Sequence, residues 1–118
     1  MAISNVPNLS GGILFSDTDN AGTAVVVKAS SAVIYAMELD NTANAAATYT
    51  RFHNTGTVTP GTTVPDTLIM TPASTKITMV FPNGWTFGTA LTITSGTSAT
   101  LATTTAPTSD FAIKIVYV

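Results

Sequence analysis

The stretch KITMVFPNGWTFGTALTI, residues 76–93, carries the clearest structural pattern in the chain. Its large apolar residues fall on every second position on both sides of a Pro82-Asn83-Gly84 break, which is the period of strands with one face in a core. Proline presets φ for a turn, and asparagine and glycine tolerate the positive φ of a reversal. We therefore predict a hairpin that supplies much of the core. Its core-facing residues are Ile77, Met79, Phe81, Trp85, Phe87, Leu91 and Ile93.

At 118 residues, the chain is long enough for one hydrophobic core and too short for two. It contains no cysteine, which excludes disulfides and thiolate metal sites. Its first twelve residues lack the basic region and apolar run of a secretory signal. No stretch approaches the ~18 continuous apolar residues of a membrane-spanning helix, so we expect no membrane partner.

Charged residues are unusually scarce, at 8% of the chain against about a quarter in ordinary soluble domains. The four basic residues are scattered and cannot form an electrostatic footprint for nucleic acid. We expect a surface of small and uncharged residues, without the lysines and glutamates that usually protect sheet edges from pairing. Part of this surface is therefore expected to be covered in the working state, by copies of the chain or by a larger partner.

Residues 1–12 are interpreted as an N-terminal arm ahead of a single domain over residues 13–118. The arm shows no strand or helix period and contains a proline and two adjacent glycines. Its three spaced apolar residues, Ile3, Val6 and Leu9, are more than a solvated tail needs. Two interpretations remain open, a frayed terminus or an arm that becomes ordered on a neighbouring molecule.

The rest of the chain predicts seven or eight short strands and no helix. Residues 32–40 (AVIYAMELD) and 111–118 (FAIKIVYV) alternate, and we place their odd-numbered residues on the core face. Further strands are expected over residues 13–15, 23–29, 45–53 and 68–71.

Short strands with turn signals every 8–12 residues are typical of an antiparallel β-sandwich. We therefore predict an all-β fold, an antiparallel sandwich of the jelly-roll or immunoglobulin-like type. The pattern does not fix the order of the strands. The longest irregular stretches, residues 54–67 and 95–110, are expected to be loops.

His53 is the only histidine, so any Ser-His-Asp arrangement would depend on it. The chain has no Gly-x-Ser-x-Gly motif, and we interpret His53 as an exposed or hydrogen-bonded residue at a strand end. Glu38 and Asp40 lie two residues apart and could perform acid–base chemistry on glycosides, but surface or interface salt bridges, for example with Arg51, are favoured. No catalytic residue and no enzymatic activity are expected.

The segment Asp17-x-Asp19-x-x-Gly22 begins like a calcium-binding loop. The fifth and twelfth positions of that pattern should carry ligands, and here they are Ala21 and Lys28. We interpret the segment as a turn capped by its own side chains and expect no metal. No glycine-rich phosphate cradle is present either, so no cofactor is expected.

Four phrases in the middle and C-terminal parts of the chain carry a resemblance to a known family. They are MELDNTANAAATYTRFHN (37–54), VPDTLIMTPAS (64–74), MVFPNGWTFGTALTIT (79–94) and TAPTSDFAIKIVY (105–117). Together they resemble the short, Thr- and Ala-rich, cysteine-free virion proteins of tailed bacteriophages. Within that group, capsid decoration or cement proteins are small β-sandwiches, often trimers, that sit on the outer shell and lock neighbouring capsid subunits.

The resemblance implies a structural protein that binds the major capsid protein on the outside of the shell and stabilises it. It implies assembly in the host cytoplasm, a location in the virion, and a homotrimer. The surfaces expected to contact the partner are the arm and the two long loops. Their candidate residues are Ile3, Val6, Leu9, Val58, Val64 and Leu101.

Two other classes of function remain open. A neck, tail or fibre component of the same virion would share this composition and β architecture. A carbohydrate-binding adhesion module would need an exposed aromatic side chain, for which Tyr49 and Trp85 are the candidates. Both residues are more readily interpreted as core or core-edge residues.

Overall fold

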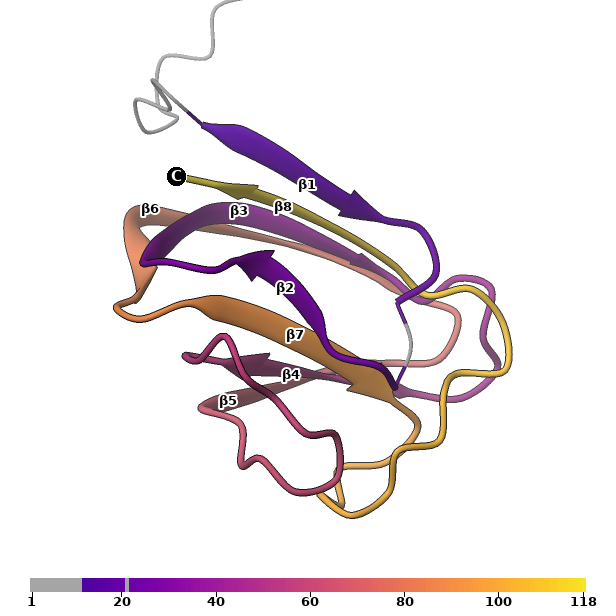
Figure 1. Ribbon diagram of the computed structural model, residues 1–118. Coiled ribbons are helices and arrows are strands. Elements are labelled where there is room, and N and C mark those ends of the chain that lie inside the picture. The colour runs from indigo at the N-terminus through magenta and orange to yellow at the C-terminus, as the bar shows by residue number, and fades with distance from the viewer. Residues whose placement is uncertain (1–11, 21) are drawn as a thin grey trace, which may run out of the picture.

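The computed structural model describes residues 12–20 and 22–118, and these form eight strands in two four-stranded antiparallel sheets (Figure 1). The first sheet has the order β1-β8-β3-β6 and the second sheet has the order β2-β7-β4-β5. The predicted all-β antiparallel sandwich is therefore confirmed. The strands are β1 (Ile13–Asp17), β2 (Val25–Lys28), β3 (Ala32–Asp40), β4 (Thr48–His53), β5 (Thr67–Thr71), β6 (Lys76–Phe87), β7 (Leu91–Gly96) and β8 (Ala112–Tyr117).

The pairing of the strands follows a jelly roll. Each strand of the first half pairs with its counterpart from the other end of the chain: β1 with β8, β2 with β7, β3 with β6, and β4 with β5. The chain is thus a long two-stranded ribbon that rolls up, and ladders between β3 and β8 and between β4 and β7 complete the sheets. This order selects the jelly roll from the two sandwich types left open by the sequence.

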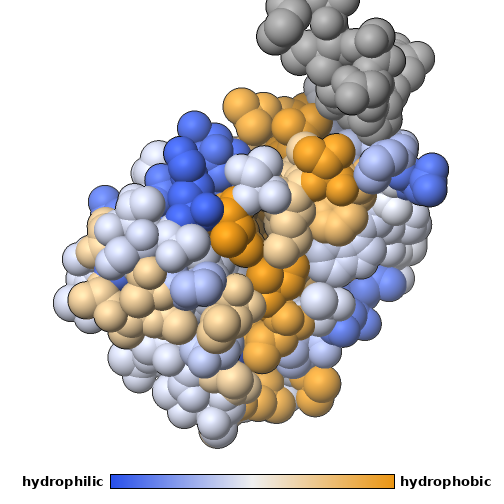
Figure 2. Space-filling model, turned by 180° about the vertical axis from the view of Figure 1, so that it is seen from behind, coloured by the Kyte–Doolittle hydropathy of each residue, from blue (hydrophilic) through white to orange (hydrophobic). Residues whose placement is uncertain are grey.

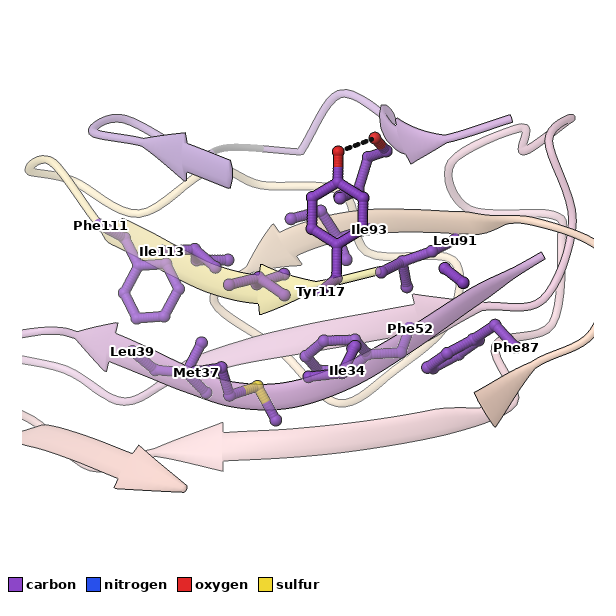
Figure 3. Close-up of a cluster of buried hydrophobic side chains, with 13 residues drawn as sticks. Ile34, Met37, Leu39, Phe52, Phe87, Leu91, Ile93, Phe111, Ile113 and Tyr117 are labelled. Carbon is purple, nitrogen blue, oxygen red and sulfur yellow. Dashed lines mark hydrogen bonds between the residues drawn. The ribbon is translucent and has the colours of Figure 1, made fainter. Parts of the chain in front are cut away.

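Side chains of both sheets meet in one core (Figure 3). Phe52 and Leu91 from the second sheet and Ile34 from the first are all completely buried. The Tyr117 hydroxyl donates a hydrogen bond of 3.4 Å to the backbone carbonyl of Val27, which gives a buried polar group a partner. The odd-numbered residues of the last strand segment are buried as predicted. They are Phe111, Ile113, Ile115 and Tyr117.

The predicted hairpin at residues 76–93 is wrong. β6 runs from Lys76 to Phe87 without reversing and belongs to the first sheet, whereas β7 belongs to the second. The chain crosses between the sheets at residues 88–90. The predicted core face is nevertheless confirmed, because all seven of its odd-numbered apolar residues belong to the core or pack against it.

A large bulge in β6, with four residues opposite one, lies where the turn was predicted. Ala36 of β3 pairs with Val80, and Ile34 pairs with Trp85, so residues 81–84 lie opposite Tyr35 alone. The surplus residues bend the strand and leave it in its sheet. A bulge therefore absorbs the residues that favour a turn.

Two residue types make this bulge possible. Pro82 lacks a backbone donor and is tolerated because β6 is the last strand of its sheet. Gly84 has a φ of +77°, which glycine adopts without strain. A Cβ at this position would also collide with the side chain of Val33.

The same irregularity changes the buried face of β3 part-way along the strand. Met37 and Leu39 are buried as predicted, but Ile34 takes the core position that was predicted for Val33 and Tyr35. The register shifts just after Ile34, against both neighbouring strands. Because successive side chains alternate between faces, one extra residue exchanges inside and outside.

Candidate functional site

A groove lies between β5 and β6, the two strands that end their sheets on the same open side of the sandwich. Its volume is about 400 Å³, and none of its lining residues is charged. Seen from the side shown in Figure 2, apolar side chains form a band across the molecule. We call the groove between β5 and β6 the edge groove. It is lined by Thr67, Ile69, Met79, Phe81, Gly84 and Trp85.

Trp85 connects the edge groove to the core. Its ring centroid lies 5.0 Å from that of Phe52, 4.8 Å from that of Phe87, and 5.5 Å from that of Phe81. Tilted aromatic contacts at these distances are favourable. Trp85 is half-buried, so the interpretation of this residue as a core-edge residue is confirmed.

The two strands beside the edge groove each have one unpaired backbone edge among the described strands. β5 pairs only with β4, and β6 pairs only with β3, among the strands of the described residues. Each therefore presents one edge of backbone N–H and C=O groups without a strand partner. An extended segment can add to such an edge while its side chains enter a neighbouring pocket.

The outer face of the second sheet is different, because two loops of the same chain cover it. Arg51 of β4 is only 5% exposed, and its Nη2 donates hydrogen bonds of 2.6 Å to the Ser98 carbonyl and 3.0 Å to the Thr100 carbonyl. These bonds fasten the 97–110 loop to the sheet. The predicted example, a salt bridge of Glu38 or Asp40 with Arg51, is therefore wrong, since β3 and β4 are consecutive in the chain but lie in different sheets.

His53 lies beside Arg51 under the same loops. It is 1% exposed, and neither ring nitrogen has a hydrogen-bond partner among the described residues. Burial lowers its pKa, and the nearby Asp66 carboxylate opposes that shift. The prediction of an exposed histidine is therefore wrong, because the segment after β4 folds back over the strand.

The cavity beside His53 is small, and Arg51 is the only charged residue besides His53 in its lining. Its volume is about 10 Å³, the size of one water molecule. Besides Arg51 and His53, the lining consists of threonine, serine, glycine, proline and leucine residues, so no carboxylate lines the cavity. Across residues 12–20 and 22–118, no three histidine, cysteine or acidic residues are grouped to hold a metal ion.

The acidic turn after β1 is capped locally. The Asp17 carboxylate accepts hydrogen bonds from the backbone N–H of Asp19 at 3.1 Å and from the side-chain amide of Asn20 at 2.9 Å. Asp40 is held in a similar way, since hydrogen bonds from Thr42 lower the pKa of its carboxyl group. These carboxylates serve their own turns, as the sequence predicted for the first of them.

The structure separates the predicted contact residues. Leu101 is half-buried and lines the cavity around His53, and Val58 is also half-buried. Val64 is 73% exposed, so it alone of these loop residues presents most of its side chain to solvent. The arm residues Ile3, Val6 and Leu9 lie outside the described residues.

Sequence reasoning missed the edge groove as a surface. Met79, Phe81 and Trp85 were correctly placed on a core-facing side, but their strand proved to be the last of its sheet. Strand order decides this exposure, and strand order is not readable from the alternating pattern. The weak local signal was Pro82, which favours an edge position.

No family model matches the chain, and no curated protein matches it. Among solved structures, one similar chain comes from a study described as "Bacillus endospore appendages form a novel family of disulfide-linked pili". The likeness spans 90% of this chain and 83% of that one, with a TM-score of 0.42 and 16% identity. In the part of the chain that the structure describes, no helix is long and apolar enough to cross a membrane.

Proposed function

We propose that this chain is a structural virion protein without enzymatic activity, a decoration or cement protein that binds the outside of the major capsid shell. The observation that supports this proposal is the edge groove, an uncharged apolar surface between two free sheet edges. The four sequence phrases that resemble phage virion proteins supply the partner. The proposed location is the capsid surface, after assembly in the host cytoplasm.

The edge groove suits an extended segment of a capsid subunit. Backbone groups along β5 or β6 would pair with the segment, and apolar side chains would enter between Phe81 and Ile69. No charged residue lines the groove, so a segment that binds there and excludes water does not bury an unpaired ion of the groove. A capsid cement protein needs permanent contacts of this kind and no catalytic site.

Mass spectrometry of purified virions tests the proposal, with copies of this chain counted against the major capsid protein. We expect a ratio near one, or a fixed simple fraction set by occupied symmetry axes. A handful of copies per particle would move the protein to the neck, tail or fibre. Absence from virions would refute a virion role.

A groove variant tests the mode of binding. Phe81→Glu places a charge in the edge groove and should abolish binding to shells that lack the protein. Val26→Glu is the matched control, since Val26 is 46% exposed, lies on β2 at the other end of the second sheet, and does not line the groove. Equal binding by both variants would exclude the groove as the contact and direct attention to Val64 and the arm.

A carbohydrate-binding module is the second candidate, and the position of Trp85 in the edge groove is the observation in its favour. Sugars also need polar partners around an aromatic ring, and Thr67 supplies the only side-chain hydroxyl in the groove lining. Tyr49 is half-buried on the other sheet. Glycan binding that is lost in Trp85→Ala would favour this candidate over the capsid.

A further inference from the structure

The outer face of the first sheet carries a row of apolar side chains that crosses all four strands. Leu14 pairs with Val116, Val116 with Ala36, and Ala36 with Val80. Leu14 is 61% exposed and Val80 is 57% exposed, while the two central residues are partly exposed. We call these four residues the apolar row.

A polar row runs beside it, two residues further along each strand. It consists of Ser16, Lys114, Glu38 and Thr78, which are paired in that order across the sheet. The cation and the anion occupy the two central strands, β8 and β3. A shallow depression of about 200 Å³ spans both rows.

We propose that this face is a dimer interface, on which a second copy of the chain packs face to face around a two-fold axis parallel to the strands. The axis lies above the sheet, midway between β8 and β3. It places β8 of each copy over β3 of the other copy, and β1 of each copy over β6 of the other. Such an isologous contact requires a surface that complements itself. This inference is independent of the proposed function, and it replaces the homotrimer that the resemblance implied with a dimer.

Both rows meet that requirement. In the apolar row, Val116 would pack on Ala36 of the partner subunit, so a large side chain meets a small one. In the polar row, Lys114 would face Glu38 of the partner subunit, and the reciprocal pair would form on the other side of the axis. Packed sheets lie about 10 Å apart and rotate by about 30°, which preserves alignment best at the centre, where these four residues lie.

Charge placement favours a second copy over another partner. A chain with only four basic and six acidic residues places one of each sign side by side at the centre of an exposed face. Their opposite signs are exchanged by the same axis that matches the apolar row. A copy of this chain offers the complementary charges at the required spacing by construction.

The expected affinity is low. Four strands at ~4.8 Å spacing and five residues at ~3.4 Å give a footprint of roughly 300 Å² per copy. A standard stable interface buries about 800 Å² per partner, so we expect a weak, transient dimer and look for it between about 10 μM and 1 mM protein. Sedimentation equilibrium over this concentration range should show a monomer that associates to twice the chain mass.

A charge-swap mixing experiment tests the axis directly. Glu38→Lys alone and Lys114→Glu alone each place like charges opposite one another in a homodimer, so each variant should be monomeric. An equimolar mixture of the two variants restores opposite charges at both pairs of a heterodimer, and dimerisation should return. Mixing cannot repair a defect within one chain, so recovery separates the intermolecular contact from any effect on folding.

An apolar-row variant gives the second test, with circular dichroism to verify folding. Val80→Glu should weaken dimerisation at least tenfold, and Met70→Glu should leave it unchanged. Met70 is a fair control because it is 50% exposed and lies on the edge strand of the other sheet. A monomer at 1 mM, a trimer, equal sensitivity to both variants, or failure of the mixture to dimerise would each overturn the proposal.

Discussion

The outer faces of the two sheets are treated in opposite ways. The second sheet carries Arg51 and His53 on its outer face, and the loops of the same chain bury both. The first sheet carries Leu14 and Val80 on its outer face, and both stay more than half exposed. Loops thus cover the polar centre of the second sheet, whereas no described residue buries the two ends of the apolar row on the first sheet.

Physical chemistry accounts for this difference. A buried cation needs hydrogen bonds of fixed geometry, and the loop that follows β7 supplies two carbonyls to Arg51. The 97–110 segment is tethered to the sheet, so its ordering cost is that of a loop and not of a second molecule. An apolar face needs no hydrogen bonds in fixed directions, so the flat sheet of another molecule can bury it. The difference teaches that the loops over the second sheet contribute to the fold's own stability, while the apolar row is the surface that we propose for a second copy.

The largest effect on the free energy of unfolding is expected for a core residue, which belongs to neither outer face. Phe87→Ala should lower the free energy of unfolding by about 4 kcal/mol, because Phe87 is 2% exposed and its removal leaves a cavity. Phe81→Ala is the matched control at the edge groove, where the ring is only partly buried, and it should cost clearly less. Chemical denaturation measures both. Equal losses would contradict the division between core and groove.

Removing the cation beneath the loops should have the next largest effect. Arg51→Met should lower the free energy of unfolding by roughly 2–3 kcal/mol, because two loop carbonyls lose a charged donor. Lys114→Met on the outer face of the first sheet should change it by less than about 0.5 kcal/mol. Hydrogen exchange should also speed up across residues 97–105 in the first variant alone. Similar losses in both variants would show that the comparison of faces is wrong.

Acid should weaken the covered face. Burial lowers the pKa of His53 in the folded state below its ordinary value of 6.5, so the unfolded chain binds the proton more readily. The free energy of unfolding should therefore fall as the pH drops below about 6.5, by at most ~1.4 kcal/mol per pH unit, and level off below the folded-state pKa.

The control for this prediction is His53→Gln, which cannot titrate. Its unfolding free energy should be flatter than that of the natural chain between pH 7.5 and 5.5 in the same buffers. A parallel pH dependence of the two proteins would assign the effect to carboxylates and not to His53.

The smallest effect is expected at the apolar row. Val80→Thr should change the monomer's free energy of unfolding by less than about 0.5 kcal/mol, measured at concentrations below dimer formation. Val27→Thr is the matched substitution at a valine that is 9% exposed, and it should cost more because it buries a hydroxyl. A large loss at Val80 would mean that the apolar row is already packed within the chain.

Much of the fold could be predicted from local pattern, and the errors lie at identifiable residues. Alternation placed Ile113 and Phe87 in the core, and period-two patterns survive any strand order. The Pro82-Asn83-Gly84 phrase was assigned to a turn, because the same residues suit a turn and an edge bulge. In β3, the bulge after Ile34 inverted the faces, which no spacing rule reveals.

The candidate site was less predictable than the fold. Trp85 and Phe81 were recognised as core-facing, but their place at an open edge depends on which strands end the sheets. Arg51 and His53 looked like surface residues because they alternate with Phe52, and only the return of two loops buries them. Long-range contacts of this kind have no signature in a single strand.

By itself, the sequence determined the β class, the short strands and most inward-facing side chains, because alternation is a local property of the backbone. Tertiary structure decided the jelly-roll order, the edge groove and which outer face the loops cover. These depend on which distant strands pair, as β1 does with β8 and β2 with β7. Pairing is set by the summed burial of all strands together, so no segment specifies it alone.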